Sequence, residues 1–505
     1  MVGIAKFYIT TAIDYVNAAP HLGHLYEKVC ADALARYHRL KGDDVFFLTG
    51  TDENAQKNEQ AARRAGVPTK EFVDRNAAKF KELCKTFAIS YDDFIRTTED
   101  RHVKVAQLIF KKLYDRGYIY KSYYEGLYCP GCEEFKQEKD LVDGKCPEHG
   151  VEPELVKEEN YFFKLSEFEK EIEQLLKSER FVYPEKWRAE LLARLKEGLR
   201  DLSVSRPNLT WGITTPIDPN HKIYVWIDAL ANYISALGYP DGERYRRYWP
   251  ADVHLIGKGI TWFHAVIWPA ILLAAEIPLP KLILVHGYVT VEGRKMSKSL
   301  GNVVDPLELT KRYQVDAIRY YLLREIAFGS DGDFSENMLR ERINNELVAN
   351  LGNFIYRTMS FLWKEFGGKV PGPAELDASD RQFSAELGRL AGLVAREMEG
   401  FRIDRAVKLI RDFSSRANQY FQLKEPWDTK DSTCLYLCAN AVASLAIVMG
   451  PFMPIASESI WKQLNLEGSV HEQRWERAAS LILKPGHEIN EPRPLFKKVD
   501  SRSNS

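Results

Sequence analysis

The sequence predicts an α/β protein in which a parallel sheet is split by an inserted domain and followed by an all-α helical bundle. Strand-like and helix-like segments alternate at the N-terminus, a turn-rich stretch with clustered cysteines interrupts them between about 118 and 224, and helical periodicity dominates from about 339. The 505 residues exceed what one hydrophobic core organises, so we expect several domains.

The first fifty residues predict a strand–helix–strand unit. Segments 6–10 (KFYIT) and 44–50 (DVFFLTG) are rich in β-branched and aromatic residues. Between them, apolar residues recur at helical spacing, at Leu25, Val29, Ala33, Tyr37 and Leu40. Gly42 can cap the end of that helix. A helix that joins two neighbouring strands in this way implies a parallel sheet.

The second half of the sheet is predicted after the turn-rich stretch. Strand-like text returns at 222–230 (KIYVWIDAL), 254–258 (HLIGK) and 281–289 (KLILVHGYV). We therefore interpret 1–117 and 225–338 as two halves of one α/β domain, and 118–224 as an insertion between them.

Helical periodicity predicts a bundle over 339–484. Its first helix has an apolar face formed by Leu339, Ile343, Leu347, Leu351, Phe354 and Ile355, and similar periods run through 378–424 and 433–465. The last segment, 485–505, is polar and proline-rich and ends in SRSNS. It is expected to be a docked arm with a disordered end.

Composition points to a cytoplasmic protein. The chain carries 70 basic and 71 acidic residues, so any contact with nucleic acid must depend on local patches. The most apolar run, 264–275, is too short to span a bilayer and contains a proline, and the N-terminus lacks a secretory signal. The seven cysteines do not form a disulfide framework. We expect no membrane association.

The cysteine cluster predicts a zinc site. Cys129 and Cys132 lie in CPGC, and Cys146 and His149 lie in CPEH, so each pair forms a knuckle that directs two ligands to one point. Four protein ligands leave no open position, so one structural Zn2+ per chain is expected. The alternative is unpaired surface thiols beside a chance histidine.

Two further motifs suggest a phosphate site. His21 and His24, in PHLGH, begin the first helix, where backbone N–H groups and the helix dipole attract anions, and Gly23 allows close approach of a base or ribose. Lys295 and Lys298, in RKMSKSLG, follow the strand-like segment 281–289. Taken singly, the histidines could be ordinary surface or core residues and the lysines a solvated basic turn.

Together, PHLGH and KMSKS in this order on a split α/β sheet resemble the class I aminoacyl-tRNA synthetases. Within that class, the chain is similar to the methionyl-tRNA synthetase family through TAIDYVNAAPHLGH, LTGTDE, CPGC with CPEH, LSVSRPNLTWGI, YVWIDAL, IGK followed by FHAVIWPA, KMSKSLGN, ELVANLGNFIYR and KEPW. The likeness runs from about residue 5 to about 495. It implies a Rossmann-type sheet with a zinc-knuckle insertion, and a KMSKS region that contacts the tRNA stem.

The resemblance implies a methionine–tRNA ligase that uses ATP and Mg2+. Methionine would attack the α-phosphate of ATP, and His21, His24, Lys295 and Lys298 would bind ATP and stabilise the negative charge, with Gly23 beside the nucleotide. Lys298 is expected to stabilise the transition state. The resemblance also implies a methionine pocket, with Asp52 binding the ammonium: Ile13, Tyr15, Asp52, Trp226, Ala229, Tyr233 and His264. Taken alone, Asp52 would be a turn residue and the aromatic set plain core.

The resemblance further implies that the helical bundle reads a CAU anticodon through Asn353, Arg357 and Trp427. Unstacked loop bases are recognised by stacking and by hydrogen bonds to their edges. The alternative for Asn353 and Arg357 is a solvated helix side. A monomer is expected, because the chain stops after the bundle without a further C-terminal module.

Two departures from the family pattern motivate an alternative function. The family usually has TDEHG where this chain has Asn54 and Ala55 after Glu53, and GKD where it has Gly259. The chain could therefore be a catalytically weakened paralogue that binds tRNA, although the intact histidines and lysines favour the enzyme. A synthetase for another aliphatic amino acid is disfavoured, because the insertion is too short for a large editing domain.

Overall fold

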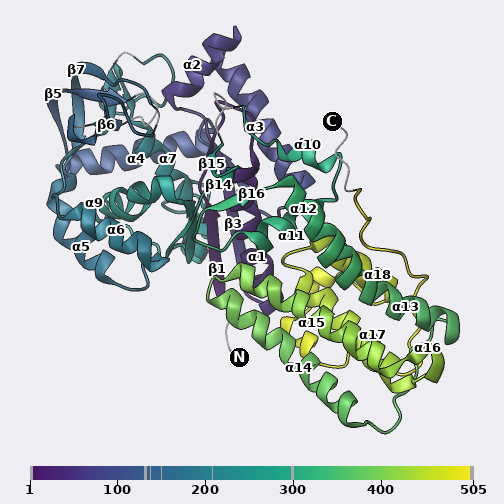
Figure 1. Cartoon of the computed structure of the whole chain (residues 1–505). Helices are drawn as coiled ribbons and strands as arrows, with labels where there is room; N and C mark the ends of the chain where they lie inside the picture. The colour runs from purple at the N-terminus through teal and green to yellow at the C-terminus, as the bar shows by residue number, and fades with distance from the viewer. Residues whose placement is uncertain are drawn as a thin grey trace.

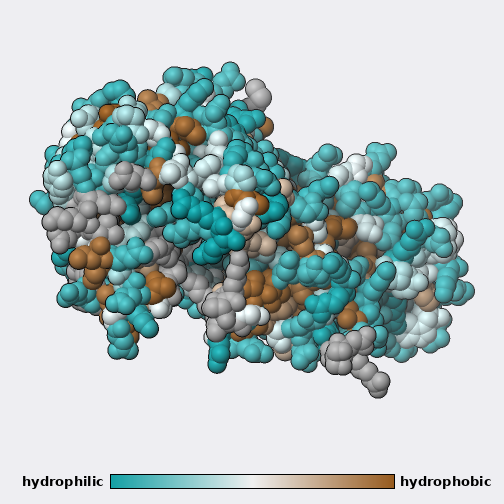
Figure 2. Space-filling model, turned by 90° about the horizontal axis from the view of Figure 1, so that it is seen from above, coloured by the Kyte–Doolittle hydropathy of each residue, from teal (hydrophilic) through white to brown (hydrophobic). Residues whose placement is uncertain are grey.

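A broad α/β lobe tapers into an elongated helical lobe in the computed structural model, which describes residues 4–129, 134–136, 138–148, 150–207, 209–296 and 301–500 (Figure 1). Figure 2 shows the same two lobes from above, with hydrophilic side chains over most of the visible surface. The N-terminal strands lie at the centre of the α/β lobe, and the yellow C-terminal arm runs back along the helical lobe. A Rossmann-like parallel sheet followed by a helical domain is therefore confirmed.

The central sheet has the order β2-β3-β1-β12-β13-β8, with β4 beside β3. Its pairings are parallel throughout the described chain. The strands are β1 (Lys6–Thr11), β2 (Asp14–Tyr15), β3 (Asp44–Asp52), β4 (Asp93–Arg96), β8 (Val182–Tyr183), β12 (Val253–Gly257) and β13 (Ile283–His286). The predicted strands 6–10, 44–50 and 254–258 correspond to β1, β3 and β12.

Helices cover both faces of this sheet. Phe7 and Ile9 of β1 belong to a core shared with α1 (Leu22–Lys41) and α3 (Thr69–Thr86), whereas Tyr8 belongs to a second core. The second core is shared with α4 (Asp100–Asp115), α7 (Val225–Ser235) and α9 (Trp268–Ala274). This alternation along β1 is what a sheet buried on both faces requires. The predicted first helix is α1, and Gly42 caps it with φ 90°.

The prediction of a strand over 222–230 is wrong for most of its length. Only β11 (His221–Ile223) is a strand, and α7 begins at Val225. All eleven residues of α7 are buried, so the helix has no exposed face, and of its helically spaced polar residues, Asp228, Asn232 and Ser235, only the first lies within the predicted segment. The predicted strand 281–289 is also divided, into β13 and β14 (Val289–Val291).

The stretch 118–224 contains an antiparallel sheet of its own. Its order is β6-β5-β7-β9, formed by β5 (Ile119–Cys129), β6 (Glu134–Lys136), β7 (Glu154–Phe163) and β9 (Leu202–Ser203). The hairpin β10 (Ser205–Pro207) with β11 follows, and α5 (Glu169–Lys177) and α6 (Glu185–Leu195) lie between β7 and β9 along the chain. β8, from the same stretch, joins the central sheet beside β13.

A small three-stranded sheet connects the two lobes. It has the order β15-β14-β16, with β15 (Arg294–Lys295) and β16 (Gly332–Phe334). Two short helices, α2 (Gln56–Ala65) and α8 (Glu243–Tyr248), belong to the α/β lobe. Two others, α10 (Pro306–Thr310) and α11 (Val315–Glu325), lie between β15 and β16 along the chain.

The helical lobe begins with α12 (Glu336–Arg342), a π-helical segment (Ile343–Gly352) and α13 (Asn353–Glu365). It continues with α14 (Ala378–Glu399), α15 (Ile403–Lys424), α16 (Pro426–Thr429), α17 (Ser432–Met449) and α18 (Pro454–Gln463). α17 is long and apolar enough to cross a membrane, but 94% of it is buried among the other helices, which is the environment of a core helix.

A buried arginine joins the lobes. Arg319 of α11 is completely buried, and its guanidinium donates to Asp32 Oδ2 of α1 at 2.7 Å. It also donates to the Phe87 carbonyl at 2.9 Å and to the Pro451 and Phe452 carbonyls in the turn between α17 and α18, at 3.1 and 3.0 Å. The helix that begins with the PHLGH motif is thus tied to the bundle.

Candidate active site

A cavity of about 340 Å³ opens at the carboxyl ends of the central strands. Residues 12–18 follow β1, Asp52 ends β3 and Gly257 ends β12, and all three regions contribute to its lining. The chain crosses to opposite faces of the sheet after β1 and β12, so this is the crevice where open α/β sheets bind ligands.

His21 and His24 lie in this cavity as a stacked pair, with ring centroids 3.7 Å apart. The Gly23 N–H donates to His21 Nδ1 at 3.1 Å, and the His21 N–H donates to His24 Nδ1 at 3.0 Å. Each Nδ1 therefore accepts a backbone hydrogen bond, and in a neutral imidazole the proton then resides on Nε2. The local backbone makes both side chains Nε2–H donors.

Burial keeps both imidazoles uncharged. It lowers the pKa of His21 from 6.5 to about 3, with a smaller contribution from His24. Burial likewise lowers the pKa of His24 to about 3, and the positive charge of Lys28 adds to the effect. At physiological pH the pair presents two neutral donors to the cavity.

Gly23 is required for this arrangement and brings the second motif near. A Cβ at position 23 would lie 2.9 Å from His21 Cε1, too close for the imidazole to fold over its own helix. The same position is 3.7 Å from Met296 Cε, in the KMSKS motif. The Leu22 N–H also donates to the Val304 carbonyl at 3.1 Å, so the segments around the two motifs are in contact. The Lys295 side chain and all of Lys298 lie outside the described residues.

The seven residues predicted to bind methionine all line this cavity. Tyr233 and His264 form a fixed pair, because His264 Nδ1 is 3.0 Å from the Ile260 carbonyl and its Nε2 is 2.7 Å from the Tyr233 hydroxyl. Burial lowers the pKa of His264 to about 4. Nδ1 must then donate to the carbonyl and Nε2 must accept from Tyr233, so this wall of the cavity is neutral.

Asp52 is held at the cavity by the buried residues that follow it. Glu53 is completely buried and accepts two hydrogen bonds from Arg96, at 2.6 and 2.9 Å. The Glu53 carbonyl accepts from Trp211 Nε1 at 2.7 Å, which ties the LTWGI segment to this loop. Asn54, the departure from the family pattern, donates to the Thr97 carbonyl at 3.0 Å and is not among the residues that line the cavity.

The structure adds three cavity residues that the sequence did not reveal. Glu27 Oε2 lies 2.9 Å from His286 Nε2, while the buried Oε1 of Glu27 has no hydrogen-bond partner among the described residues. Its position one turn after His24 on α1 could have indicated it. Asp14 forms a buried ion pair with Lys28, and Tyr288 follows β13. An acidic residue beside a buried cation carries no sequence signal.

The predicted zinc ligands are only partly described. Cys129 ends β5 and Cys146 lies in a tight turn closed by the Gly150 N–H to the Cys146 carbonyl at 2.7 Å, and both thiols are buried. Cys132 and His149 lie outside the described residues. Among those that are described, no group of three metal-ligating side chains gathers. Two buried cysteines, one at the end of a strand and one at the start of a turn, are suitable donors for Zn2+.

The predicted anticodon residues gather on the helical lobe. Asn353 and Arg357 are one turn apart on α13, and the Arg357 guanidinium lies 4.7 Å from the ring centroid of Trp427 in α16. It also lies 4.4 Å from the ring of Phe421. Asn353 Nδ2 donates to Asn418 Oδ1 at 3.3 Å. Polar edges and an aromatic face therefore occur together, as single-stranded RNA recognition needs.

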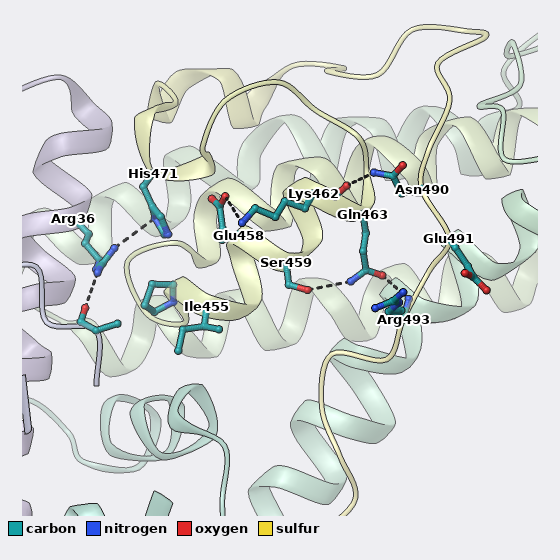
Figure 3. A pocket seen from close by; sticks show the side chains of 12 residues that line it. Arg36, Ile455, Glu458, Ser459, Lys462, Gln463, His471, Asn490, Glu491 and Arg493 are labelled. Carbon is teal, nitrogen blue, oxygen red and sulfur yellow. Dashed lines mark hydrogen bonds and ion pairs between the residues drawn. The ribbon is translucent and has the colours of Figure 1, made fainter. Parts of the chain in front are cut away.

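A larger cavity, of about 760 Å³, lies elsewhere, where α1 and α18 meet the C-terminal arm (Figure 3). Its residues largely bond one another: Gln463 receives the Arg493 N–H at 2.6 Å, and Asn490 donates to the Lys462 carbonyl at 2.7 Å. None of the predicted catalytic residues lines it. This cavity is therefore the place where the C-terminal arm docks against α1 and α18.

Paired neutral histidines near Met296 of the KMSKS motif, at the edge of a parallel sheet, are the features of a class I aminoacyl-tRNA synthetase. Comparison with known proteins agrees. Residues 7–152 and 140–359 match the family model described as tRNA synthetases class I (M), and residues 380–500 match the anticodon-binding domain of tRNA ligase.

Comparison with individual proteins identifies the family within this class. The chain is 46% identical to a methionine–tRNA ligase of Caldanaerobacter subterraneus subsp. tengcongensis, over 98% of this chain and 79% of that protein. It is 42% identical to that of Thermotoga maritima, over 98% and 81%. The structure of Mycobacterium tuberculosis methionyl-tRNA synthetase in complex with methionyl-adenylate matches with a TM-score of 0.94 and 39% identity, covering 98% of this chain and 100% of that one. The chain belongs to the methionyl-tRNA synthetase family.

Proposed function

We propose that the cavity between β1 and β12 is where methionine and ATP react. The chain is an ATP-dependent methionine–tRNA ligase. It forms methionyl-adenylate and pyrophosphate, then transfers methionine to the 3′ end of tRNA. The observation that carries the assignment is the pair of neutral Nε2–H donors, which share one cavity with a neutral, largely aromatic pocket.

In the first step, a methionine carboxylate oxygen bonds to the α-phosphorus of ATP as the bond to pyrophosphate breaks. Little covalent help is needed, so the protein's work is positioning and charge stabilisation. The Nε2–H groups of His21 and His24 donate to phosphate oxygens, Gly23 allows the nucleotide close to the helix, and Lys295 and Lys298 supply positive charge. Mg2+ accompanies ATP and is held mainly by its phosphates.

Methionine occupies the other end of the cavity. The Asp52 carboxylate binds the ammonium, and the side chain lies among Ile13, Tyr15, Trp226, Ala229, Tyr233 and His264. The fixed tautomer of His264 supports this assignment, because a charged imidazole would oppose the entry of a thioether. Aromatic rings also make favourable contacts with sulfur.

Methionine-dependent pyrophosphate exchange tests the roles. The wild-type protein should exchange pyrophosphate with methionine and with none of the other amino acids at a comparable rate. Lys298→Ala should reduce kcat about a hundredfold or more with little change in the KM for methionine, because the charge is needed most when the phosphate becomes more negative. Lys104→Ala, on the outer side of α4, is the matched control. A Lys298→Ala protein with the wild-type kcat would remove this lysine from the mechanism.

The assignments of the anticodon residues and of the zinc ligands are supported by the resemblance to the family and by the positions described above. Asn353, Arg357 and Trp427 read a CAU anticodon, and Cys129, Cys132, Cys146 and His149 hold one structural Zn2+. Segments 1–117 and 225–338 form the two catalytic halves, and the second of them contains the KMSKS stem-contact region. Segment 118–224 forms the connective insertion, 339–484 the anticodon bundle and 485–505 the arm. The protein acts as a monomer in the cytoplasm.

The alternative, a weakened paralogue that only binds tRNA, is not favoured. Its motivation was the pair of departures at Asn54 and Gly259. Asn54 bonds the Thr97 carbonyl instead of facing the cavity, and relatives that are 42–46% identical over nearly the whole chain are methionine–tRNA ligases. A wild-type protein without exchange activity for any amino acid would revive the alternative.

A further inference from the structure

Trp427 lies in a short, tightly turned segment between two long helices. This segment, α16, covers only Pro426–Thr429 and joins α15 to α17 at the far end of the helical lobe (Figure 1). The residues on either side of it, Glu425 and Lys430, both have a left-handed backbone, with φ of 44° and 50°. Residues that carry a Cβ rarely adopt this conformation, so contacts beyond the turn are needed to hold it.

The Lys424 ammonium supplies such contacts at the start of the turn. It lies 2.8 Å from Asp377 Oδ2, 2.9 Å from Asp380 Oδ1 and 3.1 Å from Asp431 Oδ2. Asp377 caps the start of α14, where its Oδ1 accepts the Asp380 N–H at 2.9 Å. Asp431 caps the start of α17, where its Oδ1 accepts the Cys434 N–H at 2.9 Å. One ammonium therefore joins the end of α15 to the first turns of α14 and α17.

This ion cluster is largely shielded from water. Only 11% of the Lys424 side chain and 2% of the Asp380 side chain are exposed, so their charges interact more strongly than those of a surface pair. Asp380 Oδ1 also accepts from the Tyr420 hydroxyl at 2.6 Å, one turn before Lys424 on α15. Removal of the ammonium would leave three carboxylates close together without the cation that compensates them. Their repulsion would then loosen the junction of the three helices.

The position of the Trp427 ring depends on this junction. The ring centroid lies 4.7 Å from the Arg357 guanidinium and 6.3 Å from the Phe421 ring. The Thr429 hydroxyl donates to the Lys424 carbonyl at 2.9 Å, so the turn is tied to the residue whose ammonium is anchored. A shift of Lys424 would therefore move the indole relative to the arginine beside it, and would alter the face on which a base can stack.

We propose that Lys424 is a positioning residue for anticodon recognition, which holds α16 so that Trp427 and Arg357 face the same base. The proposal rests on the anticodon role proposed above for Trp427. Lys424 acts through the tryptophan, because its ammonium is directed at the three carboxylates and is mostly buried. Loss of this charge should weaken tRNA binding and leave methionine activation, which takes place in the other lobe, unchanged.

Steady-state charging of a tRNA with a CAU anticodon tests this role. Lys424→Met keeps an unbranched side chain and removes the charge. It should raise the KM for tRNA by up to the roughly tenfold loss expected when the stacking face is removed, while kcat and methionine-dependent pyrophosphate exchange stay near wild type. Lys424→Arg, which restores a cation, should recover most of the KM. Lys408→Met is the matched control, because Lys408 lies on the same helix and pairs with Asp404 at 3.1 Å.

Combination with Trp427→Ala distinguishes positioning from a general effect on the fold. If Lys424 acts through Trp427, Lys424→Met should add little to the loss already present in the Trp427→Ala protein. Asp431→Asn, which keeps a good capping residue for α17, should cause a smaller loss in the same direction. Melting curves identify an unfolded variant, and Asp431→Asn is judged by the same criteria if Lys424→Met does not fold.

Two results would overturn the proposal. One is full additivity of the Lys424→Met and Trp427→Ala losses, and the other is an unchanged KM for tRNA in folded Lys424→Met when Trp427→Ala is impaired. Wild-type charging by the Trp427→Ala protein would instead contradict the anticodon assignment itself.

Discussion

At the scale of single residues, the backbone decides what the active-site histidines can do. Each Nδ1 of the pair accepts a main-chain N–H, so each Nε2 must carry the proton while the ring is neutral. The first turn of α1 thereby fixes the tautomer of both imidazoles, so that each presents an Nε2–H donor. A glycine between them is needed, since a Cβ there would collide with His21.

The lowered pKa values predict how activity depends on pH. His21 and His24 have pKa values of about 3, below their usual 6.5, so neither should titrate between pH 5.5 and 8. We expect kcat/KM for methionine activation to show no step near pH 6.5. In the unfolded chain the imidazoles take up protons below pH 6.5, so their contribution to stability should be complete above that pH and decrease as the pH falls towards 3.

Pyrophosphate exchange and urea unfolding across pH 4–8 provide the measurements. His21→Gln, which keeps an N–H donor, separates the imidazole from other groups. An activity step near pH 6.5 that is present in the wild type and absent in His21→Gln would show that a histidine titrates in the working range.

The sequence predicted residues of the site that lie in continuous motifs, and missed those that depend on tertiary contact. His21 and His24 could be predicted because they begin a helix at the edge where ligands bind, and Asp52 because the segment around it resembles that of the family. Tyr288 could not, because it reaches the cavity only through the fold, with its hydroxyl packed against Gly259 of a different loop. No local pattern records that juxtaposition.

At the scale of elements, prediction succeeded where a segment has two different faces. β1 and β3 alternate between two cores, α1 repeats against one of them, and the long bundle helices other than α17 keep a solvent side. Segment 222–230 was predicted as a strand because it is apolar and ends before Asn232 and Ser235, which repeat at helical spacing with Asp228 and extend α7 to eleven residues. The division of 281–289 into β13 and β14 likewise depends on pairing with β16.

Zinc binding by segment 118–224 can be tested by substituting one of its cysteines. Cys146→Ser should lower the zinc content from one equivalent per chain and reduce the thermal stability of segment 118–224, because a common metal would join the end of β5 at Cys129 to the turn that begins at Cys146. Activation of methionine should fall only indirectly. Elemental analysis of protein purified without chelator provides the measurement, with Cys434→Ala, a buried thiol in α17, as the control. Metal-free wild-type protein would contradict the zinc assignment.

At the scale of the whole molecule, the two lobes share one hydrophobic core, because the cluster that contains Phe7 and Ile9 of β1 continues through α11 into the bundle helices. Arg319 connects Asp32 of α1 with the turn between α17 and α18, and it is buried with its charge paired. The PHLGH motif and Asp32 occupy the same helix, so the orientation of the bundle is fixed relative to His21 and His24. The anticodon residues nevertheless lie far along the helical lobe, at the end where Figure 1 shows α13 and α16.

This separation predicts that the two half-reactions respond differently to Trp427→Ala. The substitution removes an aromatic face beside Arg357, and stacking on such a face contributes roughly 1 to 3 kcal/mol per base in single-stranded recognition. Methionine-dependent pyrophosphate exchange, which needs no tRNA, should stay near the wild-type rate, while charging of a CAU tRNA should lose roughly tenfold or more in kcat/KM. Trp363→Ala, also partly exposed and on α13, is the control. Because Trp427 also packs against the bundle core, equal losses in both assays would identify it as a packing residue and withdraw the anticodon assignment.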